Sequence, residues 1–296
     1  MSVNSTTRYS CNVGYVVFNG STTSTCDVTG TWTPSNLTCV EISCGQPPDV
    51  PNANKTTDGM SVNSLTRYSC NVGYVVFNGS TTSMCDVMGM WTPSNLTCVV
   101  DCGPPVLFDP NGVLLYESTI LGSNATVECD FYFRFFGNSS SAKCDSTGKW
   151  VGVSGACLQV LWELEVDPFM ADIPEPIQDG WEMVWDGIPG QMNTHFTLNF
   201  KRGVDKILHM DTRFNNSKVI FNTYVNGVWG TLVTATSFPF ESLVPFELRV
   251  QVHSNTFKLF VNGTHFQDFD LPLPAEDIAQ VYITGNVVIE QLAFVY

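Results

Sequence analysis

The stretch HMDTRFNNSKVIFNTYVNGVWGT, residues 209–231, decides the fold of the C-terminal part of the chain. Apolar and polar residues alternate along it, as they do in a strand with one exposed face. His209, Asp211 and Arg213 are spaced by two, so a strand places them on one face within roughly 13 Å. Asn226-Gly227 is a two-residue hairpin signal. The stretch therefore predicts a β-surface that collects polar side chains beside a Trp.

Similar segments continue from about Leu161 to the end of the chain. They include HFTLNFKRG, FELRVQVHSN, TFKLFVNG, AQVYITG and NVVIEQLAFVY, and Asn262-Gly263 is a second hairpin signal. No segment of helical period is longer than two turns. Many strands at about ten-residue spacing are typical of an antiparallel β-sandwich.

Composition excludes several classes of protein. The formal net charge of −15 over 296 residues argues against nucleic acid and polyanionic glycans as partners. Nothing approaches the roughly 18 consecutive apolar residues of a membrane span. All eleven Cys lie between Cys11 and Cys157, so residues 158–296 form a region without Cys that is large enough for its own core.

Regular Cys in small units favour disulfides and an oxidising, extracellular compartment. The Cys-rich region has no CxxC pair and no His, so we expect no zinc or other metal. Ten glycosylation sequons agree with secretion. They begin at Asn4, Asn19, Asn36, Asn54, Asn78, Asn95, Asn124, Asn138, Asn215 and Asn262.

The Cys-rich region contains an internal repeat. Residues 1–40 match residues 60–99 at an offset of 59, with differences only at Thr6/Leu65, Thr25/Met84, Thr29/Met88 and Thr31/Met90. A third, diverged copy runs from Cys102 to Cys157. The unit has an early Cys and Pro-Pro, then an aromatic-x-Cys, Gly-Tyr, a Cys, Gly-x-Trp and a closing Cys.

This pattern resembles the sushi (complement control protein) module. A unit of about 60 residues has a thin core, which two disulfides and one buried Trp (Trp91, Trp150) would hold together. Four Cys allow three connectivities; the resemblance implies first-to-third and second-to-fourth. The implied pairs are Cys44–Cys85, Cys70–Cys98, Cys102–Cys144, Cys129–Cys157 and, in the first module, Cys11–Cys39.

The first module has no equivalent of Cys44, and its first residue aligns with Met60 inside the second module. We therefore expect a truncated N-terminus, an unpaired Cys26, and a signal peptide lost with the missing residues.

The C-terminal region resembles a galectin carbohydrate-recognition domain through HMDTRF, FNT, WGT, SFPFE and FKLFVNGTHFQDFD. The resemblance implies that His209 and Arg213 contact the axial 4-hydroxyl of a β-galactoside, and that Asn222 contacts the 6-hydroxyl. Trp229 would stack on the apolar face of the sugar. Asp211, where the family has Asn, would be an acceptor beside Arg213.

Two further positions depart from the family pattern. Leu232 and Thr234 stand where the family has an acidic and a basic residue, so we expect weak or altered lactose binding. The alternative is a protein–protein adhesion molecule whose galectin-like domain has lost its sugar.

The sequence predicts no enzyme. Glu163, Glu165 and Asp167 alternate in WELEVD as glycosidase carboxylates can, but they lie at the linker. Nucleophile and phosphate-loop motifs do not occur, and we expect no cofactor.

The sequence thus predicts an all-β chain of tandem disulfide-stapled sushi modules followed by an antiparallel, jelly-roll-like β-sandwich. The predicted domains are a truncated sushi module (1–41), two further modules (42–99 and 100–158) and a galectin-like domain (159–296). The predicted function is a secreted modular lectin for galactose-containing glycans, with the sushi modules as a stalk or an interaction array for protein partners.

Overall fold

The computed structural model describes residues 2–191 and 194–296. These residues form β-strands and turns, with a short 3₁₀ turn at Ala275–Asp277, which confirms the predicted all-β class. Two compact units result. The first comprises Met1–Pro105, Tyr116–Ala125 and Ala142–Val151, and the second comprises Val106–Leu115, Thr126–Ser141 and Gly152–Tyr296. Within the described chain, no helix is long and apolar enough to cross a membrane.

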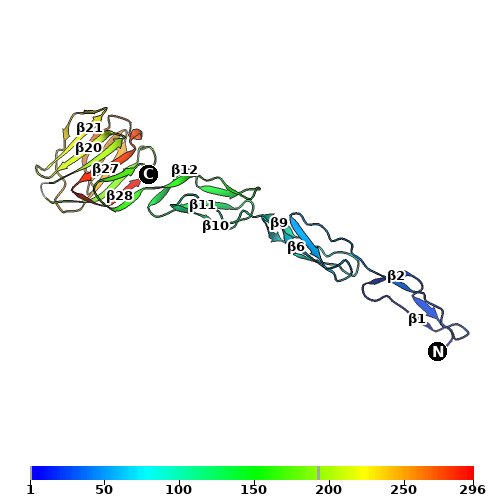
Figure 1. The fold of residues 1–296 in the computed structure, drawn as a ribbon. Coiled ribbons are helices and arrows are strands. Elements are labelled where there is room, and N and C mark those ends of the chain that lie inside the picture. Colours follow the sequence, from blue (N-terminus) through cyan, green and yellow to red (C-terminus); the bar gives the residue numbers. More distant parts are fainter. Residues whose placement is uncertain (1, 192–193) are drawn as a thin grey trace. The chain divides into compact units, whose positions relative to one another are not determined.

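Short antiparallel strands build the Cys-rich segments (Figure 1). The first two segments contain β1 (Thr6–Arg8), β2 (Tyr15–Asn19), β3 (Thr23–Thr25), β4 (Thr38–Glu41), β5 (Ala53–Thr57), β6 (Leu65–Cys70), β7 (Tyr74–Asn78), β8 (Thr82–Met84) and β9 (Thr97–Val100). The third contains β10 (Gly112–Tyr116), β11 (Asn124–Cys129), β12 (Phe133–Ser139), β13 (Ser141–Cys144), β14 (Trp150–Val151) and β15 (Ser154–Gln159).

Disulfides replace an extended core in these segments. The described residues form Cys11–Cys39, Cys44–Cys85, Cys70–Cys98, Cys102–Cys144 and Cys129–Cys157, the pairs that the resemblance implies. Cys26 is buried and forms no disulfide within the described chain.

The two tryptophans that were expected to be buried lie partly exposed, because the segments are too thin to enclose an indole ring. Each instead fixes a backbone carbonyl by hydrogen bonding. Trp91 Nε1 donates to Gly45 O (3.1 Å), and Trp150 Nε1 donates to Gly103 O (2.8 Å).

The C-terminal sandwich has two antiparallel sheets. One has the order β16-β28-β18-β24-β25-β26, and the other has the order β17-β27-β19-β20-β21-β22, with β23 also paired to β21. The strands are β16 (Leu161–Glu165), β17 (Phe169–Asp172), β18 (Glu182–Pro189), β19 (His195–Arg202), β20 (Asp205–Arg213), β21 (Lys218–Val225), β22 (Val228–Trp229), β23 (Val233–Thr234), β24 (Phe246–His253), β25 (Thr256–Val261), β26 (Thr264–Asp270), β27 (Gln280–Gly285) and β28 (Val287–Val295).

Aromatic rings fill the space between the sheets. Trp185 and Phe196 are fully buried, and their ring centroids lie 5.5 Å apart in an edge-on arrangement. Phe200 and Phe257 join the two sheets at a centroid distance of 4.5 Å. Large buried rings of this kind contribute most of the apolar area that stabilises such a core.

Both predicted hairpins are confirmed. Asn226 and Gly227 have φ of 53° and 82° between β21 and β22, and Asn262 and Gly263 have φ of 49° and 73° between β25 and β26. Two successive residues with positive φ are what a type I′ turn requires, and Asn-Gly adopts this conformation at low cost.

Reduction of the disulfides should destabilise the Cys-rich segments and leave the sandwich folded. Each disulfide closes a loop of 28 to 42 residues, which stabilises the folded state by about 3–4 kcal/mol in the chain-entropy description. We expect a reductant to abolish the calorimetric transitions of the Cys-rich segments while the sandwich transition remains. Loss of the sandwich transition on reduction, measured on the full chain, would contradict the predicted independence of residues 159–296.

Candidate functional site

The alternation of β20 divides its side chains between core and surface. Leu208 and Met210 are fully buried between the sheets, whereas His209 and Arg213 lie on the outer face of the seven-stranded sheet. Strand β21 lies next to β20 (Figure 1), and the register places Asn222 opposite His209. The structure therefore brings the predicted residues of both strands onto one surface.

A hydrogen-bond chain holds the imidazole of His209. Its Nδ1 lies 2.7 Å from Oδ1 of Asn199, the residue opposite it on β19. The amide nitrogen of Asn199 donates to Thr197 Oγ1 (3.1 Å) and to Tyr282 O (3.2 Å), so the amide oxygen is the acceptor for the ring. Nδ1 of His209 therefore carries the proton, and Nε2 is left as an acceptor.

The environment keeps this imidazole neutral. The pKa of His209 falls from 6.5 to about 4, chiefly because burial disfavours the charged form and secondarily because Lys206 is cationic. The charge of Asp211 opposes the shift without cancelling it. A neutral ring with a free Nε2 can accept a hydrogen bond from a hydroxyl group above mildly acidic pH.

Arg213 is oriented by Asp211. Nε of Arg213 donates to Oδ2 of Asp211 at 2.7 Å, which leaves the terminal N–H groups of a half-exposed guanidinium for another acceptor. Oδ1 of Asp211 is buried and has no hydrogen-bond partner among the described residues. The residue opposite Asp211 on β21 is Ile220, an apolar and buried side chain.

Trp229 lies at the other end of this surface. Its ring centroid is 5.2 Å from those of His209 and Tyr224, and Nζ of Lys206 lies 5.5 Å from the ring centroid. The indole is 50% exposed, so it is not a core residue. The indole ring is therefore held by side chains of β20 and β21, and its exposed part offers apolar area to a ligand.

Asn222 and the chain after Trp229 complete the surface. Asn222 Oδ1 accepts from Thr223 N–H at 2.8 Å, which directs its amide nitrogen to other acceptors. The segment VWGTLVTAT forms two short strands, β22 and β23, instead of one continuous strand. The chain between them passes very close to β21 at Gly230, where a Cβ would lie 2.3 Å from Thr223 Oγ1.

The family's two charged positions hold uncharged side chains that face solvent. Leu232 is 54% exposed, and Thr234 is also exposed, opposite Ile220 on β21. Beyond Arg213, a polar pocket of about 340 Å³ continues the surface. Its lining residues are Thr194, His195, Asp211, Arg213, Asn215 and Asn216.

Three contributors were missed in the sequence. In the sequence, Asn199 is an ordinary polar residue of the segment HFTLNFKRG. Only the register of β19 and β20 shows that it lies opposite His209 and can orient the imidazole. Lys206 and Tyr224 were not singled out either, although both contact the ring of Trp229.

Two of the three WELEVD carboxylates have structural partners. Asp167 accepts from Gly285 N–H at 2.8 Å, and Glu163 accepts from the side chain of Gln291 at 3.3 Å.

Comparison with known proteins finds two families along the chain. Residues 168–294 match the family model of the galactoside-binding lectins, and residues 1–39 and 44–98 match the sushi repeat. The chain therefore combines sushi repeats with a galectin-like domain, as predicted. The third Cys-rich segment, residues 100–158, lies outside both matches and is a sushi module by prediction.

Individual relatives fall into the same two groups. A mouse protein named for sushi, von Willebrand factor type A, EGF and pentraxin domains is 34% identical over 48% of this chain and 4% of its own length. Bovine galectin-4 is 29% identical over 43% of this chain and 40% of its own length. A 32 kDa β-galactoside-binding lectin of Haemonchus contortus is 28% identical, with shares of 40% and 44%. The chain spans less than half the length of each of these relatives.

Solved structures similar to this chain include Caenorhabditis elegans galectin LEC-6, which has 21% sequence identity and a TM-score of 0.45. The match covers 49% of this chain and 100% of the galectin chain. Sheep galectin-11 in complex with glycerol has 19% identity and a TM-score of 0.42 over 44% and 99% of the respective chains.

The low pKa of His209 should make the sandwich acid-sensitive. Between pH 6.5 and about 4 the unfolded chain binds a proton at this residue and the folded chain does not, so stability falls as the pH falls through this window. His209→Gln should reduce this loss, measured as the urea midpoint from pH 7 to 4.5. His253→Gln, which removes an exposed imidazole, should retain the wild-type slope. Equal slopes for His209→Gln and wild type would contradict the assignment.

Proposed function

We propose that the C-terminal domain binds galactose-containing glycans and that the protein is a secreted modular lectin. The observation that carries this proposal is one outer surface with three complementary features. It presents an acceptor at His209 Nε2, the free donors of Arg213 and the half-exposed ring of Trp229. A pyranose with several hydroxyls and an apolar C–H face fits such a surface.

Disulfides and sequons support an extracellular location for the working protein. The sushi modules would serve as a stalk or as an interaction array for protein partners. Each sugar site would bind modestly, because Leu232 and Thr234 supply no charged hydrogen bond. Useful avidity would then require several sites on one glycan-dense surface.

A second candidate function rests on the apolar edge of this surface. Leu232 is accompanied by Val228 and Val233, which are 68% and 41% exposed. An apolar edge of this kind suits an adhesion molecule that binds a protein instead of a sugar.

Substitution of Trp229 separates the two functions. Trp229→Ala should fold normally and lose retention on a galactoside resin, because the ring is half exposed and contributes little to the core. Trp185→Ala, which empties a fully buried position, should instead cost about 3–5 kcal/mol of stability. If folded Trp229→Ala binds glycans as the wild type does, the lectin proposal at this surface is wrong, and adhesion takes its place.

Substitution of Leu232 tests whether this position weakens lactose binding. Leu232→Glu should restore an acceptor on this surface and tighten lactose binding by up to roughly tenfold, or about 1.4 kcal/mol. Isothermal titration should show no such gain for Val288→Glu, which adds the same charge to the other sheet. Unchanged or weaker binding for Leu232→Glu would show that this position does not limit affinity. Arg213→Ala should abolish binding with or without this change, because Lys206 lies against Trp229 and cannot supply the forked donors of a guanidinium.

A further inference from the structure

Modules 1 and 2, residues 1–41 and 42–99, are nearly identical, and their few differences share one chemical direction. Across residues 1–40 and 60–99, each difference places a large apolar side chain in module 2 where module 1 has threonine. The replaced positions are Thr6/Leu65, Thr25/Met84, Thr29/Met88 and Thr31/Met90.

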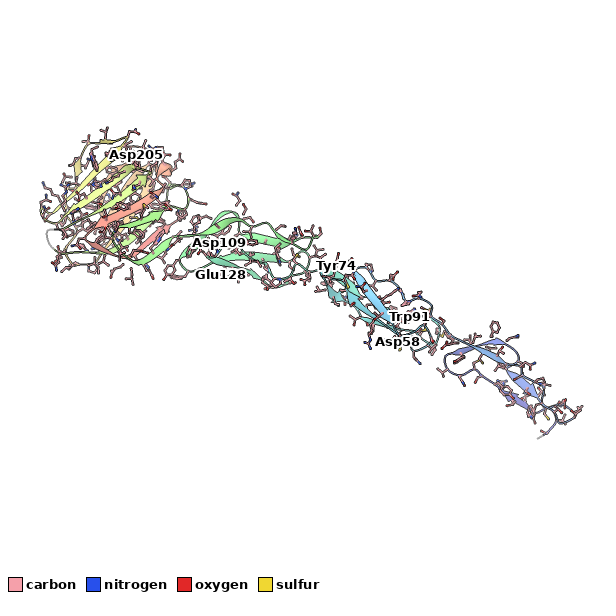
Figure 2. All side chains as sticks on the ribbon, viewed as in Figure 1. Asp58, Tyr74, Trp91, Asp109, Glu128 and Asp205 are labelled. Atoms are coloured by element: carbon pink, nitrogen blue, oxygen red, sulfur yellow. A yellow bond between two sulfur atoms is a disulfide. The ribbon has the colours of Figure 1, made fainter. Side chains whose placement is uncertain are left out.

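These positions lie on neighbouring segments of module 2, namely β6, β8 and the turn after β8, and we call them the methionine face (Leu65, Met84, Met88 and Met90). Leu65 of β6 lies directly opposite Met84 of β8. Asp86 N–H donates to Met90 O at 2.9 Å, which closes the turn that carries Met88 after β8. Figure 2 shows Asp58 and Trp91 at this end of the module and Tyr74 at the other end.

The methionine face is open to solvent. Met84, Met88 and Met90 are 44%, 76% and 61% exposed, and Leu65 is half-buried. The strand residues next to Leu65 and Met84 point inward, since Thr66 and Cys85 are fully buried. Four neighbouring apolar side chains on a surface are more than the isolated exposed residues that need no explanation.

Module 1 shows that the fold does not require these side chains. Its β1 and β3 pair Thr6 with Thr25 in the same register. Its turn is held by Asp27, whose Oδ1 accepts from Thr29 N–H and Thr31 N–H at 2.9 Å. Asp86 holds the corresponding turn of module 2 in the same way. The exposed methionines therefore add nothing that the strands or the turn need.

The same differences remove a glycan acceptor. Asn4-Ser5-Thr6 is a sequon in module 1, and its counterpart Asn63-Ser64-Leu65 is not. The two asparagines occupy equivalent exposed positions, because each N–H donates at 2.9 Å to the buried Cys of its own module. Module 1 thus has a polar face beside an acceptor site, and module 2 has an apolar face without one.

The charges around the methionine face are self-complementary. Asp58 accepts from Leu65 N–H at 2.7 Å, and Asp86 lies in the turn that carries Met88. Arg67, two residues along β6 from Leu65, is exposed on the same side. A twofold contact can therefore set Arg67 of each copy against an acidic residue of the other. Module 2 has two basic and three acidic residues, so its net charge of −1 gives two copies little repulsion here in a chain of net charge −15.

We propose that the methionine face is a self-association surface that a second copy of this chain covers. The face has fewer side chains than the 20–30 residues a side of a standard stable interface, so the dimer is weak and concentration-dependent. If the C-terminal domain binds glycans as proposed above, pairing two chains makes binding bivalent. The self-association itself does not depend on sugar binding.

The lost sequon provides a direct test. Leu65→Thr recreates a sequon that begins at Asn63, and a glycosylating host can then attach a glycan at the edge of the face. Sedimentation velocity over a concentration series would compare variants in a Cys26→Ser background, which excludes disulfide-linked dimers. Excess lactose would exclude binding of one chain's glycans by another. We expect the parent to dimerise and glycosylated Leu65→Thr to stay monomeric, whereas Asn63→Gln/Leu65→Thr retains most of the association.

Side-chain changes supply the matched controls. Met84→Thr/Met88→Thr/Met90→Thr gives module 2 the threonines of module 1, so it should fold and should raise the dimer Kd at least about tenfold. Phe77→Thr, which removes a 62% exposed side chain on β7, should leave the Kd unchanged. A parent that stays monomeric throughout the series, or a triple variant that dimerises like the parent, would overturn the proposal.

Discussion

The two-residue period of β20 is the constraint on which the site depends. Leu208 and Met210 are fixed in the core, so His209 and Arg213 have to face outward, and a shift of one residue would exchange the two sets. The same packing that stabilises the sandwich therefore orients the polar groups of the surface. One strand therefore carries both a part of the sandwich core and the candidate binding groups.

Part of this site could be predicted from local sequence, because strand spacing alone places His209, Asp211 and Arg213 on one face. The orientation of the His209 imidazole could not be predicted. It depends on Asn199, ten residues earlier, and the pairing of β19 with β20 contains an irregularity that shifts the register. The burial of Asp211 could not be predicted either, because the sequence does not show that Asp211 lies opposite Ile220 on the neighbouring strand β21.

The fold of the Cys-rich segments could be predicted more fully than their surfaces. The resemblance to sushi modules implies the disulfide pairing that the structure has, and short strands form between the bridges. Exposure, however, depends on how thin each module is, so Trp91 was expected to be more buried than it is. The same thinness leaves room on the surface for differences such as Thr25 against Met84, which the strands tolerate without a change of register.

The near identity of the two modules also affects oxidative folding. Cys44 pairs with Cys85, which lies 41 residues later. Cys26 lies only 18 residues before Cys44, and the sequence around Cys26 is almost identical to that around Cys85. Loop-closure entropy favours the shorter, non-native pair by about 0.7 kcal/mol, or roughly threefold. Cys26 and Cys85 can thus compete for Cys44 during oxidation, and a chain that forms Cys26–Cys44 would reach the native bridge by thiol–disulfide exchange. The duplicated sequence is therefore a source of alternative pairing, which packing around the native Cys44–Cys85 bridge has to outweigh.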